Sequence, residues 1–313
     1  MARTETRSSL RAQRSARVRV PAKINLYLGV GEQRDDGFHE VVTVYQAVGL
    51  FDVVHAEPST SLSVHLSGEG AEDLPRDQGN LAWQAASLLA ERHGVAPAAQ
   101  LTIEKAIPVA GGLAGGSADA AGTLVACDAL WGLELSRGDL SALAGELGSD
   151  VAFSLLGGTA LGTGRGEVLS PVLSTGVQFW WVLALATGGL STPAVYAELD
   201  RQRAADPTAS RALSAPDELL RAVRSGDPAE LAGALHNEMQ PATLTLAPHL
   251  RATLRAGTEL GALVGMVSGS GPTCAFLCAD EPSATGLAAA LAAEGVCRTT
   301  RVASGPVPGA RVT

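Results

Sequence analysis

The chain has 313 residues, 46% of them hydrophobic, which is enough for a sizeable core and for two domains. Its net charge of −9 argues against a surface that binds nucleic acid or anionic membrane, and no apolar run approaches the ~20 residues of a membrane-spanning helix. The four cysteines form no cluster with histidine that would indicate zinc, so we expect free thiols in a reducing, cytoplasmic compartment.

The N-terminal segment is basic: residues 1–20 carry six arginines and a single acid, Glu5. This composition predicts a disordered tail over residues 1–17, although a cleaved organelle transit peptide has a similar composition. At the other end of the chain, residues 303–313 are expected to form a second, frayed tail.

Alternating apolar residues over Val18–Val30 predict a β-strand that places Lys23 and Asn25 together on one face. That pair could contact a ligand or simply face solvent. Lys23 is one of two lysines among 23 lysines and arginines, and a chain that otherwise uses arginine can keep lysine where a compact ammonium is needed. For the second lysine, Lys105, we expect a solvated position near a strand end.

The polar turn Gly31–His39 follows, and it presents Phe38 and His39 side by side. An aromatic ring and an imidazole can stack on a base and hydrogen-bond to it, although such a pair is more often purely structural. The patterns that follow predict a helix over Asn80–Glu91 and strands over Val41–Val54, Ser61–Leu66 and Leu101–Val109.

The stretch Ile107–Ala121, IPVAGGLAGGSADAA, lies in the middle of the chain. Five of the residues from Gly111 to Ser117 are Gly or Ser, so backbone N–H groups can point into one small volume. Helical spacing continues as far as Gly132, so we predict a glycine loop that leads into a helix N-terminus and binds phosphate. A flexible linker is the alternative, but linkers are polar and this loop has apolar flanks.

Two better-known phosphate loops do not fit this stretch. A Walker A loop would need lysine where Ser117 stands, and a Rossmann loop would need glycine where Ala110 stands. The sequence therefore indicates a phosphate loop of another class.

Beyond the loop, a capping pair at the start of residues 136–148 predicts a helix. Asp150 then interrupts an apolar stretch, so its carboxylate must be hydrogen-bonded, ion-paired or functional. A second glycine-dense segment, residues 157–166, predicts a hairpin in which Arg165 could contact an anion.

The second half of the chain predicts a buried strand (179–186), helices (193–224, 229–239 and 283–294) and a short last strand (296–302). A mobile loop is expected at residues 204–216, and a third glycine loop at Val267–Leu277. His236, on the second of these helices, is expected to make a capping or core hydrogen bond rather than a catalytic one.

Three segments together are more specific than any one of them: PAKINLYL at 21–28, PVAGGLAGGSADAA at 108–121 and SGSGPTCAF at 268–276. This set resembles the motifs of the GHMP kinase superfamily, and the resemblance runs from about Val18 to Arg301. It implies an α/β (α+β) fold with an active site between two domains. An ATP-binding half like domain 2 of ribosomal protein S5 would span residues 18–172, and a ferredoxin-like half would span residues 173–302.

The resemblance also implies a reaction, the transfer of the ATP γ-phosphoryl group to a hydroxyl group in the presence of Mg²⁺. Lys23 and Asp150 would be the catalytic pair, and lysine suits the narrow space beside a carboxylate better than forked arginine. The residues implied to enclose the ATP phosphates are Pro108, Val109, Ala110, Gly111, Gly112, Leu113, Ala114, Gly115, Gly116, Ser117 and Ala118.

Within the superfamily, the segments DGFH at 36–39 and GSDVAF at 148–153 resemble those members that phosphorylate an alcohol carrying a cytidine diphosphate group, a step of isoprenoid precursor synthesis. The partner implied is therefore a small-molecule substrate with a cytidine diphosphate group, and neither a nucleic acid nor a membrane. The enzyme would be a monomer or a homodimer. The residues implied to hold the substrate are Asn25, Phe38, His39 and Thr192, with Phe38 and His39 at the cytosine.

The chain departs from the superfamily pattern at Ala152, where proline is usual, and at Ala118, where many members have a second serine. Ser117 is then the single hydroxyl left to contact a metal-bound phosphate, so the metal ligands stay open. Two other functions fit the same pattern. One is a kinase for a different small alcohol, such as homoserine or mevalonate. The other is a non-catalytic nucleotide-binding protein, which would be expected to have lost Lys23 or Asp150.

Overall fold

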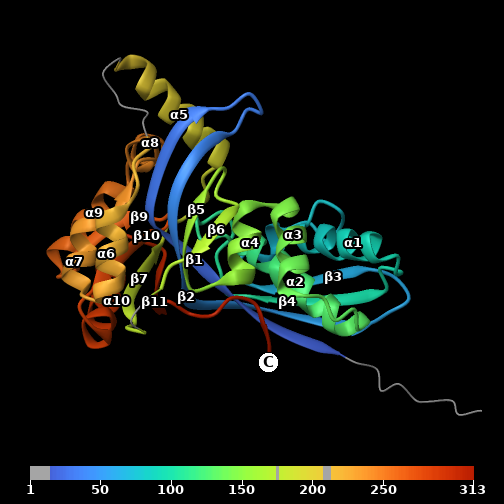
Figure 1. The fold of residues 1–313 in the computed structure, drawn as a ribbon. Coiled ribbons are helices and arrows are strands. Elements are labelled where there is room, and N and C mark those ends of the chain that lie inside the picture. The colour runs from blue at the N-terminus through green and yellow to red at the C-terminus, as the bar shows by residue number, and fades with distance from the viewer. Residues whose placement is uncertain (1–14, 174–175, 207–212) are drawn as a thin grey trace, which may run out of the picture.

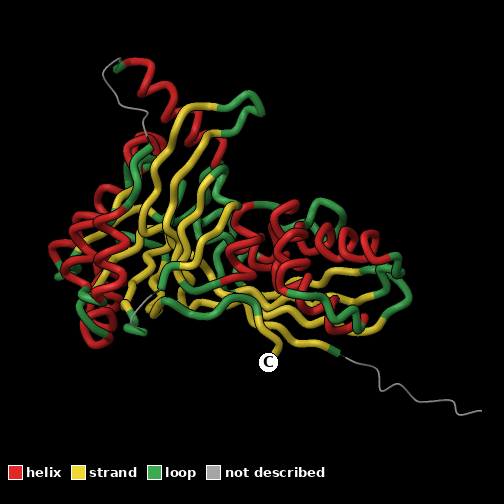
Figure 2. The backbone as a smooth tube through the Cα atoms, in the orientation of Figure 1, coloured by secondary structure: helices red, strands yellow, loops and turns green. Residues whose placement is uncertain are grey.

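The computed structural model describes residues 15–173, 176–206 and 213–313. The expected N-terminal tail lies outside the described residues as far as residue 14, as does the middle of the loop expected at 204–216. Two sheets organise the described part, and helices pack on either side of the strands (Figure 2). Within that part, no helix combines the length and the apolar character needed to cross a membrane.

The larger sheet has eight strands and is built on a long hairpin that rises beyond the other strands (Figure 1). The strand order is β12-β1-β2-β4-β3, with β5 and β6 attached through β2, and β8 through β1. The polar turn predicted from the sequence joins the two hairpin strands. The strands are β1 (Ala16–Gln33), β2 (His39–Pro58), β3 (Ser63–Gly68), β4 (Ala99–Lys105), β5 (Thr159–Thr163), β6 (Val168–Pro171), β8 (His236–Asn237) and β12 (Arg311–Val312).

Four helices lie on one side of this sheet: α1 (Leu81–His93), α2 (Gly115–Trp131), α3 (Arg137–Leu147) and α4 (Ser149–Leu156). Their ends follow the signals in the sequence, because Asn80 caps α1 and Gly132 ends α2. At α3, Ser136 and Asp139 form the predicted capping box. A single 3₁₀ turn, η1 (Ala71–Asp73), follows β3.

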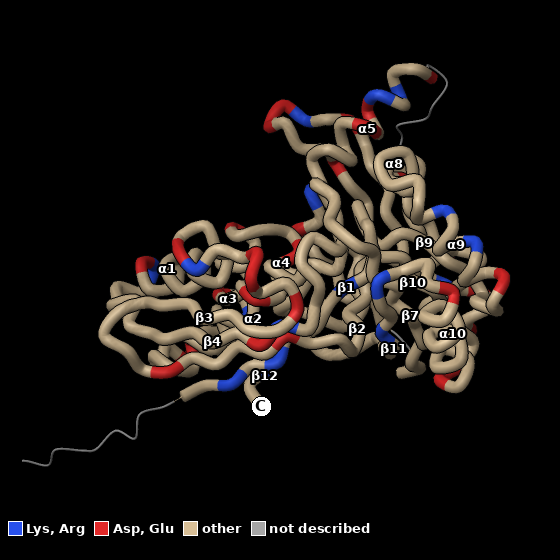
Figure 3. Tube along the Cα trace, turned by 180° about the vertical axis from the view of Figure 1, so that it is seen from behind, with Lys and Arg blue, Asp and Glu red and all other residues tan. Residues whose placement is uncertain are grey.

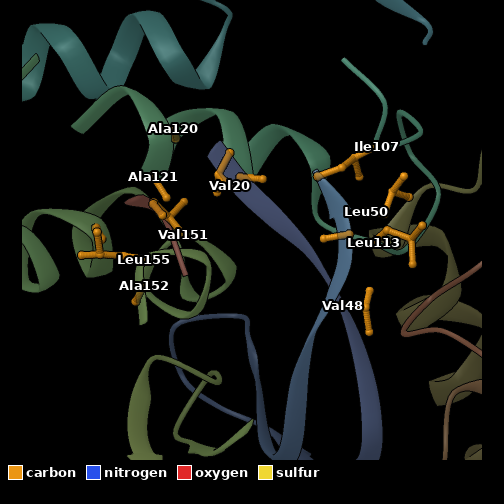
Figure 4. Close-up of a cluster of buried hydrophobic side chains, with 14 of the residues drawn as sticks. Val20, Val48, Leu50, Ile107, Leu113, Ala120, Ala121, Val151, Ala152 and Leu155 are labelled. Carbon is orange, nitrogen blue, oxygen red and sulfur yellow. The ribbon is translucent and has the colours of Figure 1, made fainter. Parts of the chain in front are cut away.

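The core of this half forms where α2 lies against the hairpin. Small residues on α2 allow a close approach: a Cβ atom on Gly122 would lie 2.8 Å from Cγ2 of Val54. Figure 4 shows Val20 of β1 beside Ala121 of α2 and Val151 of α4, all fully buried. Packing of this density fixes the start of α2 relative to the sheet.

The smaller sheet is antiparallel, with the order β11-β7-β10-β9. Its strands are β7 (Phe179–Leu185), β9 (Val264–Val267), β10 (Cys274–Cys278) and β11 (Thr299–Gly305). The helices of this half are α5 (Thr192–Ala205), α6 (Asp217–Ser225), α7 (Pro228–Ala234), α8 (Gln240–Leu246), α9 (Leu250–Glu259) and α10 (Glu281–Glu294). The four cysteines are free, as predicted.

A buried polar contact joins the two sheets. The indole Nε1 of Trp181 on β7 donates to Oε1 of Gln46 on β2, at 3.0 Å. Both side chains are fully buried. At the surface, Arg298 and Glu69 form an ion pair across the same junction. Charges of both signs are otherwise interspersed over both halves (Figure 3).

The prediction of a frayed tail at residues 303–313 is wrong. β11 extends to Gly305, and β12 pairs antiparallel with β1, so that Val312 lies opposite Val18. Ala310 is buried, and its N–H donates to the carbonyl of Ser154. The segment is ordered by partners that lie far away in sequence, which its composition could not indicate.

The helix expected over residues 229–239 is confirmed only in its first half. α7 ends at Ala234, and His236 and Asn237 instead form β8, parallel to Tyr27 and Leu28 of β1. The Asn237 amide donates to two carbonyls of the third glycine loop region, those of Val267 and Gly269, both at 2.8 Å. Tertiary hydrogen bonds therefore outweigh a weak local preference for helix.

Candidate active site

A cavity of about 720 Å³ opens between the two halves, and it is lined by parts of all three glycine-rich segments. It brings together six features that the sequence singled out: Lys23, Asn25, Phe38, the glycine loop, Asp150 and Thr192. Residues from opposite ends of the chain thus face one volume large enough for a nucleotide and a second substrate.

Lys23 and Asp150 form an ion pair, with Nζ 3.4 Å from Oδ2. Lys23 is almost completely buried, whereas 33% of the Asp150 side chain is exposed, on the cavity side. A chain of hydrogen bonds fixes the lysine, because its Nζ donates to Oδ1 of Asn25 (2.8 Å) and the Asn25 amide donates to Thr43 (2.8 Å). The carboxylate is therefore the accessible partner, and the ammonium is the partner anchored by hydrogen bonds.

Asp150 occupies the first turn of α4, which directly follows Gly148. A carboxylate is stabilised at that position by the helix dipole. The apolar residues Val151, Ala152 and Phe153 that follow it are buried and hold α4 against the core. The apolar residues after Asp150 are thus buried in the core, while the Asp150 carboxylate itself lines the cavity.

Tyr45 is a cavity residue that the sequence analysis missed. Its ring lies 5.4 Å from Nζ of Lys23 and packs on Phe153, with ring centroids 4.8 Å apart. Burial, followed by the charge of Asp150, raises the pKa of the Tyr45 phenol well above its usual value. The phenol therefore stays protonated beside the Lys23–Asp150 pair throughout the neutral range.

The backbone of the glycine loop enters the left-handed region at three positions. Ala110, Gly112 and Ala114 have φ values of 51°, 75° and 60°, in the left-handed region. A Cβ atom on Gly112 would lie 2.2 Å from the carbonyl oxygen of Ser268. The third glycine loop thus packs against the backbone of the first, and Ser268 Oγ donates to the Gly112 carbonyl at 3.1 Å.

α2 begins immediately after this loop, and no side chain caps its N-terminus. The first backbone N–H groups of α2 are therefore available to bind an anion, assisted by the helix dipole. The cavity lining includes seven of the eleven residues predicted to surround phosphate, namely Ala110, Gly111, Gly112, Ala114, Gly115, Gly116 and Ser117. Leu113 and Ala118 point into the core instead, where Figure 4 shows Leu113.

The opposite end of the cavity has an aromatic wall. Phe38 lies near the hairpin tip and is 54% exposed. The guanidinium carbon of Arg165 lies over the Phe38 ring, 5.0 Å from its centroid. Tyr196 of α5 also lines the cavity, and the sequence analysis missed it. Thr192, one turn earlier, pairs its hydroxyl with that of Ser270 at 2.8 Å.

His39 lies behind this wall and does not line the cavity. Its ring stacks on Tyr196, with centroids 4.8 Å apart, and its Nε2 lies 3.0 Å from Oδ1 of Asp200. Burial raises the pKa of Tyr196 to about 12, with further contributions from Asp150 and Asp200. His39 thus supports the orientation of Tyr196, and its contact with a base stays a prediction.

The expected solvated position of Lys105 is wrong. Its side chain is fully buried and forms ion pairs with Asp52 and Asp119, at 2.6 and 2.7 Å. Both carboxylates come from other elements, β2 and α2, so the strand pattern around Lys105 gave no sign of them.

Two family models match the chain: the GHMP kinases N terminal domain over residues 80–158 and the GHMP kinases C terminal domain over residues 219–297. A relative from Mycolicibacterium smegmatis, "4-diphosphocytidyl-2-C-methyl-D-erythritol kinase", is 59% identical and covers 95% of this chain and 92% of its own. A relative of the same name from Rhodococcus jostii is 59% identical over 94% of each chain.

Solved structures agree with this result. A crystal structure of "4-(cytidine 5'-diphospho)-2C-methyl-D-erythritol kinase" has a TM-score of 0.74 and 31% identity, covering 92% of this chain and 98% of that one. Homoserine kinase from Cytophaga hutchinsonii shares the fold at 18% identity, with a TM-score of 0.72 over 96% and 97% of the chains. The family models span both halves of the cavity, and these likenesses run over almost the whole chain, so this protein belongs to the GHMP kinase family.

Proposed function

We propose that the protein is an ATP-dependent kinase that phosphorylates the 2-hydroxyl group of the methylerythritol moiety of 4-diphosphocytidyl-2-C-methyl-D-erythritol. This reaction is a step of isoprenoid precursor synthesis by the methylerythritol phosphate pathway. The observation that carries the proposal is the Lys23–Asp150 pair, which faces the same cavity as the uncapped start of α2. Relatives that are 58–59% identical over nearly the whole chain bear the name of this activity.

The glycine loop supplies the site for the ATP phosphates. Backbone N–H groups from Gly115 to Ser117 are free of side-chain caps and converge at the positive end of α2. Phosphoryl transfer passes through a loose transition state that needs positioning and charge neutralisation more than covalent help. Fixed N–H donors at the start of α2 provide both the positioning and part of the charge neutralisation.

The catalytic pair acts on the acceptor. The acceptor hydroxyl oxygen attacks the γ-phosphorus, the bond from that phosphorus to the ADP oxygen breaks, and the hydroxyl proton passes to Asp150. Lys23 holds the carboxylate in place and lies close enough to the cavity to contact the transferred phosphoryl oxygens. The protonated Tyr45 forms the wall behind both groups, and its neutral ring excludes water from the pair.

Mg²⁺ is expected to accompany ATP, and the oxygen donors near the loop fit this ion. Ser117 Oγ and the Asp150 carboxylate both line the cavity, and hard oxygen ligands suit Mg²⁺. Among the described residues there is no group of three or more His, Cys, Asp or Glu side chains that could hold a metal. This donor set fits an ion held mainly by phosphate and water, which would neutralise phosphate charge when bound.

The aromatic wall is the proposed site for the cytosine. Phe38 and Tyr196 offer ring faces on which a base can stack, and Thr192 and Ser270 offer hydroxyl groups between the wall and the catalytic pair. His39 supports this wall from behind, because its ring stacks on Tyr196 and its Nε2 contacts Asp200. A small alcohol such as homoserine would make no use of these rings.

A substrate panel tests the proposal. ADP release would be measured with ATP, Mg²⁺ and, separately, 4-diphosphocytidyl-2-C-methyl-D-erythritol, homoserine, mevalonate and galactose. We expect turnover with the cytidine compound alone, and ³¹P NMR of the product should show a new phosphomonoester on the 2-hydroxyl group. Asp150→Asn is the control that should lack turnover. Turnover with another alcohol would reject the assignment of the substrate, and ATP binding without turnover would indicate a binding protein.

A further inference from the structure

Asp52, Lys105 and Asp119 form a buried charge cluster outside the cavity. Nζ of Lys105 donates to Oδ2 of Asp52 at 2.6 Å and to Oδ2 of Asp119 at 2.7 Å. The exposed fractions of the three side chains are 0%, 0% and 2%. None of the three lines the cavity, so the cluster does not touch a substrate there.

The cluster is joined to both ends of the glycine loop. Before the loop, Oδ1 of Asp52 accepts hydrogen bonds from the backbone N–H groups of Ala106 and Ile107, at 2.6 and 2.8 Å. After the loop, Asp119 lies in the second turn of α2, five residues into the helix. A single ammonium group, that of Lys105, therefore ties together the chain that enters the loop and the helix that leaves it.

The cluster contains two carboxyl groups and one ammonium. The second oxygen of Asp119, Oδ1, has no hydrogen-bond partner among the described residues, so a full negative charge there would be poorly solvated. Burial, with the charge of Asp52 added, raises the pKa of Asp119 well above its usual value despite the attraction of Lys105. Burial lowers the pKa of Lys105, but the two carboxyl groups outweigh it and the net shift is upward.

The ammonium of Lys105 is thus shared between two buried carboxyl groups that come from different elements, β2 and α2.

We propose that Asp52, Lys105 and Asp119 are positioning residues for ATP, which clamp the two ends of the glycine loop so that the first N–H groups of α2 point at the phosphates. This inference rests on the proposed function in that it takes ATP as the loop's ligand. It assigns a role to the second of the chain's two lysines, at a distance from the Lys23–Asp150 pair.

The test measures the affinity for a non-hydrolysable ATP analogue by calorimetry, without any acceptor alcohol. Three variants probe the clamp. Lys105→Met removes the shared ammonium, Asp119→Leu releases only the helix end, and Asp119→Asn keeps an oxygen that can accept from Lys105. Asp128→Asn is the matched control, because Asp128 lies on the same helix but accepts from Leu135 N–H at its far end.

We expect Lys105→Met and Asp119→Leu to bind the analogue about 10- to 100-fold more weakly, the loss that follows when one or two charge-assisted hydrogen bonds are misaligned. Asp119→Asn should stay within about threefold of the parent protein, because its amide oxygen can still accept the hydrogen bond from Lys105. Asp128→Asn should lower the melting temperature without changing the affinity. In steady state, the KM for ATP should rise more than the KM for the acceptor.

Asp119→Leu leaves one ammonium and one carboxylate, so it should fold even if Lys105→Met does not. Unchanged affinity in a folded Asp119→Leu protein would overturn the proposal, as would an equal loss in Asp128→Asn. If the parent protein fails to bind the analogue at all, the proposed function fails together with this inference. If it binds the analogue but phosphorylates none of the alcohols in the panel, only the proposed function fails.

Discussion

Replacing Lys23 by methionine removes the ammonium from the proposed catalytic pair while keeping the length of the side chain. At an effective dielectric constant of about 20, Coulomb's law gives roughly 5 kcal/mol for charges at the observed 3.4 Å. Because 33% of the Asp150 side chain is exposed, solvent screens part of this attraction. We therefore expect between about half and all of the 5 kcal/mol to be lost from the stabilisation of the transition state. The expected loss in kcat is therefore roughly 10²- to 10⁴-fold.

The affinity for ATP should change little in Lys23→Met, because the N–H groups of α2 supply the phosphate contacts and Lys23 belongs to β1. Single-turnover measurement of phosphoryl transfer, with a titration of the ATP analogue alongside, separates the two quantities. Lys23→Arg is the informative companion variant. Its forked head does not fit the space between Asn25 and Asp150, so we expect it to restore charge without restoring rate.

Two outcomes would refute this reasoning. A kcat within about fivefold of the parent value would show that the pair contributes little to the transition state. A parallel loss of ATP affinity would show instead that Lys23 acts on the ground state. Circular dichroism must show that the fold is retained, since the Lys23–Asn25 hydrogen bond also contributes to stability.

Three further predictions concern the loop, the aromatic wall and the alkaline range. Gly112→Ala would place a Cβ atom 2.2 Å from the Ser268 carbonyl at a φ of 75°, so it should cost more than ~2 kcal/mol in the free energy of unfolding measured in urea. Gly286→Ala, in open space on α10, should be neutral or stabilising and serves as its control. Phe38→Ala should raise the KM for the cytidine substrate about tenfold and leave that for ATP unchanged, and equal changes in both would reject the stacking site. Because the folded protein keeps the Tyr45 phenol neutral and the unfolded chain ionises it near pH 10, the free energy of unfolding should fall as the pH rises above about 10. Tyr45→Phe should flatten that slope, and an unchanged slope would contradict the assignment.

Features that depend on a few neighbouring residues could be predicted from the sequence. The alternation of β1, the capping box at Ser136 and the Gly132 end of α2 are all local, and all are present. The glycine loop was also predictable, because a run of glycines and small residues leaves the backbone N–H groups uncovered by side chains. The cavity then brings Lys23, the glycine loop and Asp150 together, as the motifs implied.

Features that depend on distant partners could not be predicted in the same way. Lys105 is buried because Asp52 and Asp119 neutralise it, and these lie 53 and 14 residues away in sequence. Tyr45 was missed because its strand pattern is that of any core residue. The signal that could have found it is register, since the hairpin pairs Tyr45 with Asn25.

The pairing of β12 with β1 has a consequence for how the protein is made. Val18 and Arg19 of β1 pair with Val312 and Arg311, so this end of the strand has no partner on that side until residue 312 has left the ribosome. During synthesis that edge is a row of free N–H and C=O groups next to an apolar face, open to pairing with a neighbouring chain. The enzyme's yield in a cell should therefore depend on chaperones that shield nascent chains, more than the stability of the finished molecule would suggest.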